Sequence, residues 1–504
     1  MAGRTLLDGL QHGAAADPAI AVPGGVRLTY GQLREQVAAA ADQLAQIGIG
    51  REDRVALVLP NSAESIVLFL AAATAGTAAP LNAAYKEEEF RFYLQDTGAR
   101  VLVVPPAEGE AARRAMPAGM SLIEAHMDGQ GRLALDSDAV RDRSRTAGPP
   151  GDDDIALVLH TSGTTSRPKL VPLRHRNLFA SAGNIASTYG LTPNDVALCV
   201  MPLFHIHGLM ASTMATFRSG GLVVVPPKFD PMTFWPTLHH HSATWYSAVP
   251  TMHQMLLMRN RGERPPGADG LRFIRSSSSA LSPETMAQLE SRFGAPVVEA
   301  YGMTEASHQM ASNPLPPAPR RPGTVGVGTG VRLGIMTDAG RLLPAGSAAA
   351  GEVVIQGPNV IDGYSNNPEA NTASFVNGWF RTGDQGTIDA DGYLSLIGRL
   401  KEMINRGGEK IAPREIDEVL MQHPAVGEAV AFGSPHPTWG EEVVAAVVLK
   451  EPVPEKELIA FARERLADYK VPRKLYIVDK IPTTATGKIQ RRAVAATFNP
   501  KMTS

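Results

Sequence analysis

Cysteine is almost absent from the chain, which has 504 residues and a single cysteine, Cys199. One thiol cannot form an internal disulfide, so the sequence excludes a fold that disulfides hold together. Because Cys199 lies in the apolar segment VALCVMPLF, we expect it to be a small buried hydrophobic residue. A chain of this length can bury at least one large core and can form two or more domains.

A strong net charge is also missing. The 48 Lys and Arg residues nearly balance the 50 Asp and Glu residues, which leaves a formal net charge of -2. The composition therefore provides no overall electrostatic attraction to nucleic acid or to an anionic membrane. Neither is an expected partner.

Long apolar runs are lacking as well. The N-terminal segment MAGRTLLDGL is interrupted by Arg4 and Asp8, and it has no apolar centre of the kind that a secretory signal requires. The most apolar later stretch, residues 66–81, is broken by Gly76 and Pro80 and is too short to cross a bilayer comfortably. The final KMTS is not a peroxisomal address. We therefore expect a soluble, cytoplasmic protein.

Short apolar or β-branched runs alternate with helical patterns over the first three hundred residues. One helical segment, LSPETMAQLESRF, begins with Ser282 as a candidate N-cap and Pro283 at the first helical position. This alternation predicts an α/β fold with a substantial parallel sheet. The candidate strands lie at residues 54–60, 100–104, 155–160, 221–226 and 294–301.

The pattern changes at three places. Residues 105–154 are polar and irregular, and we interpret them as a surface connection. From Gly351 onward, glycine-rich turns separate short strands, which indicates an antiparallel section. After Arg399, a helix at residues 413–423, two strands and a second helix predict a compact α+β domain of about a hundred residues.

One loop concentrates small hydrogen-bond donors. The stretch HTSGTTSRPK, residues 160–169, follows an apolar run and holds five hydroxyl side chains and one glycine. Backbone N–H groups and hydroxyls that converge in such a turn can hold a phosphate, and Lys169 adds a mobile cation. A Walker loop is excluded because only Gly163 is present. On composition alone, an ordinary surface turn remains the alternative.

Further motifs follow this loop in a fixed order. They are PLFHIHG at 202–208, YGMTE at 301–305, GWFRTGD at 378–384, GRLKEMINRGGEKI at 398–411 and TATGKIQRR at 484–492. Together with TSGTTSRPK, they resemble the signature of the adenylate-forming superfamily, which includes acyl-CoA synthetases, firefly luciferases and the adenylation domains of peptide synthetases. The resemblance covers essentially the whole chain.

The resemblance implies a fold and a division into domains. The implied fold is α/β, with a large N-terminal domain of two βαβ-type subdomains plus a small β-barrel, followed by a mobile α+β C-terminal domain. On this chain the N-terminal adenylation domain would span residues 1–398 and the C-terminal domain residues 399–504. The domains would pivot about a hinge at Lys401.

The resemblance also implies a two-step reaction that uses ATP, Mg²⁺ and coenzyme A. A carboxylate attacks the α-phosphate of ATP to give an acyl-adenylate and pyrophosphate, and the acyl group then moves to a thiol. By position in the motifs, Lys488 would stabilise the developing charge and Glu305 would bind Mg²⁺. Thr304 would contact the α-phosphate, and His205 would flank the acid entrance.

The remaining motif positions divide between the nucleotide and the thiol. In the thiol-transfer pose, the NRGGEK and WGE segments would line the pantetheine channel, where glycines permit close backbone approach. The residues assigned to ATP are Thr161, Ser162, Gly163, Thr164, Thr165, Lys169, Ser278, Ser279, Ala280, Tyr301, Gly302, Asp384 and Arg399. Those assigned to CoA are Gly407, Gly408, Glu409, Trp439 and Gly440.

The acid specificity is predicted from the segment FIRSSSSAL and from the residues after Glu305. We assign Arg275, Ser276, Ser277 and His308 to the acid, together with His205, because a run of hydroxyls favours a small polar substrate over an alkyl chain. His308 could bind a second carboxylate. These features, with Ser166 in the loop, resemble the oxalate–CoA ligase branch of plants and fungi, although Leu170 departs from the glycine common there.

Several alternatives remain open at this point. The acid could be malonate, another short dicarboxylate or a medium-chain fatty acid. The chain could also be a stand-alone adenylation module that loads a carrier protein, or a nucleotide-binding protein without catalysis, although the intact Lys488 and Glu305 argue against the latter. His207 has no assignment and is expected to pack locally. The oligomeric state, monomer or homodimer, is not predicted.

Overall fold

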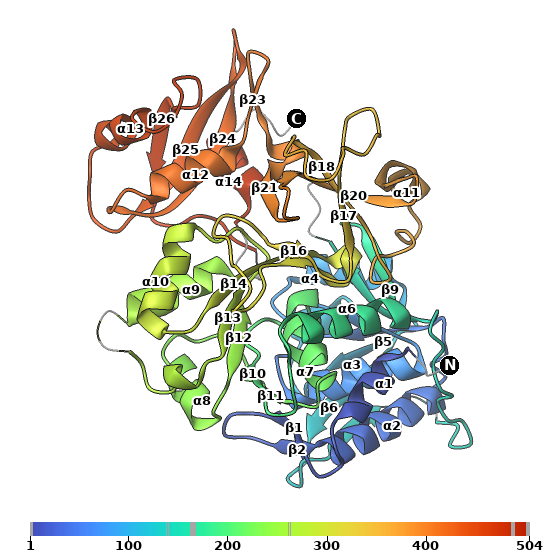
Figure 1. Cartoon of the computed structure of the whole chain (residues 1–504). Coiled ribbons are helices and arrows are strands. Elements are labelled where there is room, and N and C mark those ends of the chain that lie inside the picture. Colours follow the sequence, from blue (N-terminus) through green and yellow to red (C-terminus); the bar gives the residue numbers. More distant parts are fainter. Residues whose placement is uncertain are drawn as a thin grey trace.

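The computed structural model describes residues 4–137, 139, 141–161, 168–260, 262, 264–484 and 489–499. Three sheets form the first four hundred residues and a fourth follows them (Figure 1). This arrangement confirms the predicted α/β fold with a large N-terminal part and a smaller C-terminal part. Within the described ranges, no helix is both long and apolar enough to cross a membrane.

The first sheet has seven strands and is mainly parallel. β3 pairs in parallel with β4 and β5, while β9 and β7 add antiparallel edges. The predicted strands at residues 54–60, 100–104 and 155–160 all lie in it. In spatial order the strands are β7 (Leu133–Ser137), β6 (Ser121–Met127), β5 (Ala99–Val104), β3 (Arg54–Leu57), β4 (Thr77–Pro80), β8 (Ile155–His160) and β9 (Leu170–Arg174).

The interpretation of residues 105–154 as a surface connection was wrong in part. β6 and β7 extend the first sheet, and α5 (Glu110–Arg114) precedes them. In β6 only Ile123 and Ala125 are buried, and the other five residues are partly exposed. Strands with one partly solvated face carry few apolar residues, so composition alone did not reveal β6 and β7.

The second sheet has nine strands and carries most of the predicted site. Its centre, from β11 through β10, β12 and β13 to β14, is parallel, so the carboxyl ends of these strands meet at one edge. In spatial order the strands are β16 (Val327–Gly328), β15 (His308–Ser312), β14 (Val297–Met303), β13 (Phe273–Ser276), β12 (Trp245–Ala248), β10 (Val196–Leu198), β11 (Leu222–Val224), β1 (Pro18–Ala21) and β2 (Arg27–Thr29).

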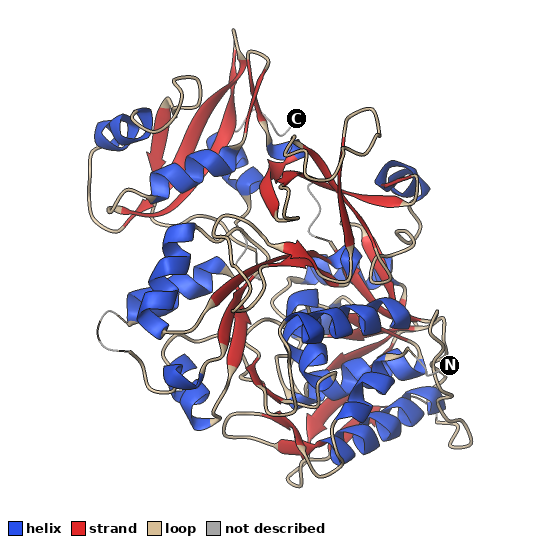
Figure 2. Cartoon of the chain, viewed as in Figure 1, coloured by secondary structure: helices blue, strands red, loops and turns tan. Residues whose placement is uncertain are grey.

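Helices cover both large sheets (Figure 2). The predicted start of α10 is confirmed, because Ser282 caps it by accepting from the Thr285 N–H at 3.1 Å and Pro283 is its first residue. The larger helices are α2 (Tyr30–Gln46), α3 (Ala63–Ala75), α4 (Glu87–Thr97), α6 (His175–Thr188), α8 (Phe234–His240), α9 (Pro250–Arg259) and α10 (Pro283–Phe293). Shorter ones are α1 (Leu6–Gly9), η1 (Leu10–His12), the π-helix η2 (His207–Met214), α7 (Ala215–Phe217), η3 (Ala268–Gly270) and η4 (Thr304–Ala306).

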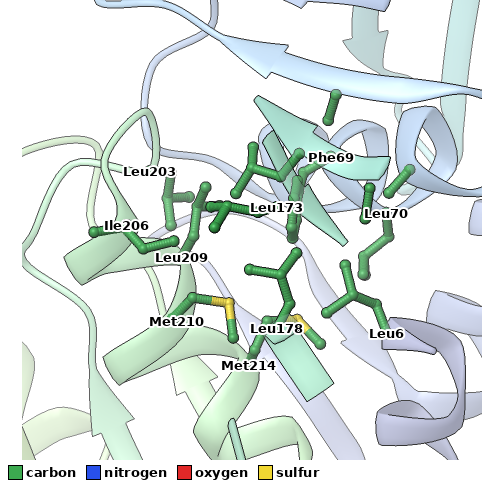
Figure 3. Close-up of a cluster of buried hydrophobic side chains, with 14 of the residues drawn as sticks. Leu6, Phe69, Leu70, Leu173, Leu178, Leu203, Ile206, Leu209, Met210 and Met214 are labelled. Carbon is green, nitrogen blue, oxygen red and sulfur yellow. The ribbon is translucent and has the colours of Figure 1, made fainter. Parts of the chain in front are cut away.

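The main core lies between the two large sheets. α3 is apolar on all sides and every residue except Glu64 is buried, which is typical of a helix enclosed by sheets. Leu6, Phe69, Leu173 and Met210 meet there from α1, α3, β9 and η2 (Figure 3). Cys199 is fully buried in the same cluster, as predicted.

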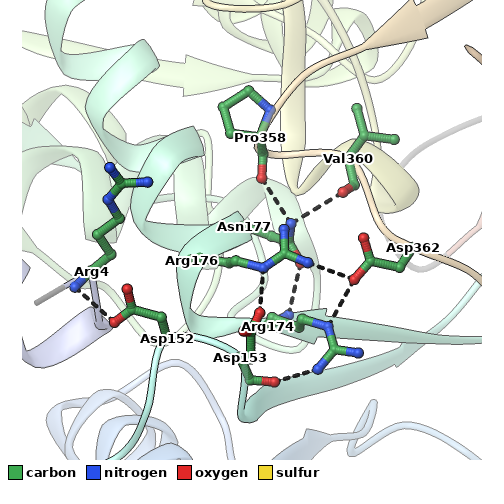
Figure 4. Close-up of polar contacts among 9 residues, drawn as sticks. All are labelled: Arg4, Asp152, Asp153, Arg174, Arg176, Asn177, Pro358, Val360 and Asp362. Carbon is green, nitrogen blue, oxygen red and sulfur yellow. Dashed lines mark hydrogen bonds and ion pairs between the residues drawn. The ribbon is translucent and has the colours of Figure 1, made fainter. Parts of the chain in front are cut away.

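A small antiparallel sheet follows, as the glycine-rich turns predicted. Its strands are β17 (Arg332–Met336), β18 (Gly351–Gln356), β20 (Trp379–Ile388), β19 (Phe375–Val376) and β21 (Leu394–Arg399), with α11 (Pro368–Ser374) beside them. Asp362 joins this part to the first sheet, because its Oδ2 atom contacts Arg174 at 2.8 Å and Arg176 at 2.6 Å (Figure 4). Asn177 donates to the Pro358 carbonyl beside them.

The last sheet has its own hydrophobic core, built on Ile416, Val430 and neighbouring residues. Its elements are η5 (Leu400–Glu402), β22 (Ile404–Arg406), β23 (Glu409–Ile411), α12 (Pro413–Met421), β24 (Val426–His436), β25 (Gly440–Leu449), α13 (Glu455–Arg463), β26 (Lys474–Ile477) and α14 (Arg491–Phe498). Arg414 donates to the Leu396 carbonyl at 3.0 Å and so contacts the preceding small sheet.

Candidate active site

The phosphate-loop prediction falls partly outside the described residues. Ser162, Gly163, Thr164, Thr165 and Ser166 lie outside them, and so does Lys488. The two ends of the loop are described and paired, because the Thr161 N–H donates to the Lys169 carbonyl at 3.0 Å. The loop therefore joins β8 to β9 at the edge of the first sheet.

Lys169 lies beside Glu305 at the foot of this loop. Its Nζ atom sits 4.4 Å from the centre of the Tyr364 ring, and the Tyr364 hydroxyl donates to Oε1 of Glu305 at 2.8 Å. Burial lowers the pKa of Lys169, and the Glu305 carboxylate opposes that shift. The structure thus joins two predicted residues through Tyr364, which sequence reasoning missed because a tyrosine in the polar loop DGYSNNP carries no distinctive spacing.

Glu305 is the residue predicted to bind Mg²⁺. In the part of the chain that the structure describes, no group of three or more His, Cys, Asp or Glu side chains could hold a metal ion. Only 7% of the Glu305 surface is exposed, and the Tyr364 hydroxyl donates to one of its two carboxylate oxygens. One fixed carboxylate fits Mg²⁺ that is otherwise held by water and by the substrate's phosphates.

The predicted ribose site is assembled from three motifs. Asp384 on β20 lies opposite Arg399 on β21, and Arg399 Nε is 2.7 Å from its Oδ1 atom. The Tyr301 hydroxyl donates to the other oxygen, Oδ2. Burial and the Asp384 charge raise the pKa of Tyr301, so the phenol stays protonated as the donor. The three residues assigned to the nucleotide by sequence therefore form one hydrogen-bonded unit.

The serine run after β13 divides into two pairs. Ser276 and Ser277 are fully buried, and the Ser277 hydroxyl donates to the Ala300 carbonyl at 2.9 Å, so it already has a partner in the sheet. Ser278 and Ser279 are only partly buried, and Ser278 adopts a positive φ of 70°. The accessible hydroxyls are thus those assigned to the nucleotide face, followed by the exposed Ala280.

His308 is buried without a hydrogen-bond partner. Only 2% of its surface is exposed, and neither ring nitrogen bonds to another group in the described part of the chain. Burial and the nearby Arg275 charge hold its pKa well below the ordinary value, so the ring is neutral near pH 7. An added Cβ at Gly302 would lie 2.2 Å from the His308 carbonyl, so glycine is needed beside it. A buried histidine with two free nitrogens indicates a ligand site.

Arg275, which the sequence assigned to the acid, lies inside the second sheet. It is fully buried on β13, and its guanidinium donates to Tyr189 Oη, Ser247 Oγ and Gln309 Oε1, each at 2.9 Å. The alternation of side chains along β13 turns Arg275 into the layer between the sheet and the helices. The sequence alone could not predict which face of the strand it occupies.

His207 was expected to pack locally, and the structure corrects that expectation. Its Nε2 atom lies 2.6 Å from Ser247 Oγ and its Nδ1 atom 2.9 Å from Ser278 Oγ. The backbone N–H of His207 donates to Nδ1 of His205 at 3.2 Å. The His207 and His308 rings meet edge to face, with their centroids 4.9 Å apart. The only sequence signal was its place two residues after His205.

The residues assigned to CoA gather at one corner of the last sheet. The Gly407 N–H donates to the Trp439 carbonyl at 2.7 Å, and Gly440 pairs with Arg406. Trp439 covers Gly407 so closely that an added Cβ there would lie 2.8 Å from the indole, while 45% of the Trp439 surface stays exposed. Gly408 and Glu409 are exposed on the same hairpin, and Lys401 is exposed in η5.

Comparisons with known proteins agree with this geometry. The family described as AMP-binding enzyme matches residues 10–365, and the AMP-binding enzyme C-terminal domain matches residues 415–488. An oxalate–CoA ligase of Arabidopsis thaliana is 47% identical and covers 96% of both chains. One from Saccharomyces cerevisiae is also 47% identical, over 89% of this chain and 87% of the relative.

Solved structures show the same architecture. The crystal structure of ATP-bound MatB from Rhodopseudomonas palustris superimposes with a TM-score of 0.88 and 30% identity, and it covers 98% of this chain and 99% of its own. The o-succinylbenzoate CoA synthetase of Bacillus subtilis, in complex with ATP and magnesium, has a TM-score of 0.84 at 30% identity. The chain therefore belongs to the AMP-binding enzyme family.

Proposed function

We propose that the protein is an ATP-dependent, AMP-forming acid–CoA ligase whose acid is oxalate. It would join oxalate to the α-phosphate of ATP, release pyrophosphate, and transfer the oxalyl group to the thiol of CoA. The observation that carries the proposal is the buried, unpartnered His308, whose ring meets that of His207, which in turn bonds to the Ser278 hydroxyl. A neutral imidazole and a hydroxyl suit a second carboxylate and do not suit an alkyl chain.

The relatives support the same acid. Both oxalate–CoA ligases share 47% of their residues with this chain over nearly their whole length. This similarity favours oxalate and CoA over the alternatives that the sequence left open, which are malonate or another short dicarboxylate, a medium-chain fatty acid and a carrier-protein acceptor.

The described residues have distinct tasks in the first step. Asp384 and Arg399 would bind the ribose, and Thr304 would contact the α-phosphate. Glu305, held by Tyr364, would bind Mg²⁺, which when present neutralises phosphate charge. Lys488 would stabilise the charge that develops between carboxylate and phosphate; it lies outside the described residues, and its role stays a prediction from the motif.

The second step would use the C-terminal part. We propose a domain division at residues 1–398 and 399–504, with Lys401 as the hinge. This position is exposed and lies in a short 3₁₀ turn between two sheets, where a change of backbone angle displaces little packed structure. After the pivot, the hairpin with Gly407 and Gly408 and the adjacent Trp439 would border the CoA thiol.

A panel of acids tests the proposal directly. Purified protein is assayed for AMP release with oxalate, malonate, glycolate, octanoate and benzoate, each with and without CoA. We expect AMP release that depends on both oxalate and CoA, with at least a tenfold lower kcat/KM for malonate. CoA-dependent turnover of octanoate or benzoate without oxalate turnover would contradict the assigned acid, and release without any CoA dependence would contradict the acceptor.

A further inference from the structure

The arginine buried in the second sheet has no carboxylate partner. The three side chains that accept from Arg275 are Tyr189, Ser247 and Gln309, all of which are neutral, and no ion pair of the described residues includes it. A buried guanidinium is usually paired with an acid, because an isolated buried charge is strongly unfavourable. Each of its three nitrogens donates to a neutral acceptor, which explains its position, but no carboxylate in the described part of the chain balances its positive charge.

The hydrogen bonds around Arg275 fix the proton on His207. Arg275 Nη1 donates to Ser247 Oγ at 2.9 Å and also faces His207 Nε2 at 3.4 Å. Because a guanidinium has no acceptor, His207 Nε2 must present its lone pair on this side. Because Nε2 then has no hydrogen to give, the close contact of 2.6 Å with Ser247 Oγ requires the Ser247 hydroxyl to donate to Nε2.

This order sets the direction of the next bond. With a lone pair on Nε2, a neutral His207 carries its hydrogen on Nδ1 and donates it to Ser278 Oγ at 2.9 Å. The Ser278 hydroxyl then accepts from His207, and its own hydrogen points away from His207. The left-handed backbone at Ser278, with φ of 70°, holds the hydroxyl in this place at some conformational cost.

We propose that Arg275 is a specificity-determining positioning residue, which acts through Ser247 and His207 on Ser278. In place of the nucleotide role that the resemblance implied for Ser278, its hydroxyl would then donate toward the far carboxylate of the acid. The inference rests on the proposed function and names which part of oxalate this network recognises. The uncompensated charge of Arg275 favours a dianion over a monoanion of the same shape. His308, whose ring meets that of His207 at 4.9 Å, completes the donor set.

The first test removes the charge and measures selectivity. Arg275→Met is compared with the unaltered enzyme for oxalate, and for inhibition by oxamate, which replaces one carboxylate of oxalate with an amide. We expect kcat/KM for oxalate to fall about 100-fold, chiefly through KM, because a charge in a low-dielectric interior acts strongly on a second charge. The inhibition constant of oxamate should change less than about threefold, since oxamate lacks the second carboxylate.

Arg272→Met is the matched control. Arg272 precedes the same strand, contacts the buried Asp195, and has no bond to His207 or Ser247. It should lower the thermal unfolding temperature without changing the preference for oxalate over oxamate. Equal loss of oxalate and oxamate binding in Arg275→Met would mean that this residue serves only stability, and it would overturn the proposal.

The second test reads the direction of the hydrogen bonds and does not require the buried arginine to be changed. An asparagine amide can replace the Nδ1 donor of histidine, whereas a glutamine amide reaches the place of Nε2. We expect His207→Asn to keep the KM for oxalate within about fivefold, and His207→Gln to raise it by about 50-fold, because only asparagine can still donate to Ser278.

The outcomes separate this inference from the proposed function. If the unaltered enzyme does not turn over oxalate, the function itself is wrong. If it does, and glutamine at position 207 is tolerated better than asparagine, His207 accepts from Ser278 and the proposed direction is wrong. Should Arg275→Met fail to fold, Ser247→Ala tests the same relay, and an oxalate KM unchanged in that variant would contradict it.

Discussion

The Tyr364 hydroxyl donates a hydrogen bond of 2.8 Å to Oε1 of Glu305, while its ring lies under the Nζ atom of Lys169. One side chain from the loop between β18 and α11 thereby fixes the candidate Mg²⁺ ligand and the candidate phosphate cation relative to each other. The phenol remains protonated, because burial and the Glu305 charge raise the pKa of Tyr364.

Tyr364→Phe should weaken the use of Mg²⁺ with ATP. The variant keeps the ring under Lys169 and removes the donor to Glu305, so the carboxylate loses its fixed orientation. We expect the Mg²⁺ concentration for half-maximal activity to rise about tenfold, the usual effect of losing a hydrogen bond to a charged group. The measurement is the initial rate against Mg²⁺ at saturating acid and CoA.

Tyr393→Phe is the control for this variant. Tyr393 donates to the Pro319 carbonyl at 2.6 Å and has no contact with Glu305. Its Mg²⁺ dependence should match that of the unaltered enzyme. A Tyr364→Phe variant with the same Mg²⁺ dependence as this control would show that Tyr364 does not hold the metal ligand.

Asp384→Asn should act on ATP alone. The change removes the carboxylate charge that Arg399 Nε contacts at 2.7 Å. Of the two oxygens, only one hydrogen-bond acceptor remains, because the other is replaced by an NH₂ group. We expect the KM for ATP to rise by about 30-fold, from the loss of one or two charge-assisted hydrogen bonds. The KM values for acid and CoA, measured in the same assay, should stay within about twofold of those of the unaltered enzyme, because Asp384 contacts neither substrate in the proposed site.

The comparison for Asp384→Asn is Asp389→Asn on the same hairpin. Asp389 contacts Arg321 and takes part in no predicted nucleotide contact. If Asp389→Asn raises the KM for ATP as much as Asp384→Asn does, the effect comes from the hairpin as a whole and not from a ribose contact.

Trp439→Ala should separate the two half-reactions. Trp439 covers Gly407 and keeps 45% of its surface exposed, so its removal changes the candidate CoA surface and leaves the nucleotide residues untouched. We expect the KM for CoA to rise about tenfold, within the range of losing an exposed aromatic contact. Acid-dependent exchange of pyrophosphate into ATP should be unchanged.

Tyr469→Ala provides the reference for Trp439→Ala. Tyr469 is another exposed aromatic residue of the C-terminal part, with 37% of its surface exposed, and it lies outside the predicted CoA residues. It should leave both half-reactions intact. Loss of pyrophosphate exchange in Trp439→Ala would place this residue in the first step instead.

Glu299→Gln should change how stability depends on pH. Glu299 on β14 accepts from the Leu281 N–H at 3.0 Å, and burial raises its pKa from 4.5 to about 7. Between these values the folded state binds more protons than the unfolded state, so the Glu299 contribution to stability falls as pH rises from 4.5 to 7. Glutamine has no charge to bury and removes this contribution.

The expected difference is large enough to measure. The free energy of unfolding of Glu299→Gln minus that of the unaltered protein should increase by about 3 kcal/mol across this pH range, since one pKa unit corresponds to about 1.4 kcal/mol. Denaturant titrations at pH 4.5, 6 and 8 provide the measurement. The exposed Glu284→Gln on α10 should show no such trend, and a trend equal in both variants would contradict the assignment to Glu299.

The sequence predicted which residues form the candidate site better than it predicted which residues hold them in place. Motif order placed Asp384, Arg399 and Tyr301 together, and the structure joins them directly. Tyr364 and His207 were missed because each acts through a contact between elements far apart in the chain, and a single sequence does not record such contacts. Their bonds run to Glu305, 59 residues away, and to Ser278, 71 residues away.

The error about residues 105–154 has a physical cause. β6 and β7 bury only some of their residues, so these strands carry too few apolar side chains to stand out by composition. The side of the sheet to which Arg275 points could not be predicted either, because a shift of one residue along a strand exchanges its two faces.

The network around Arg275 constrains how enzymes of this kind can exchange specificities. Its members Tyr189, His207, Ser247, Ser278 and Gln309 come from a single stretch of about 120 residues, in which they lie on η2, β12 and β15 and just after α6 and β13. A recombinant that crosses over inside this stretch would separate some of these residues from their partners. A crossover near residue 400 would carry the whole network across intact, so the proposed acid preference would pass on independently of the proposed CoA residues.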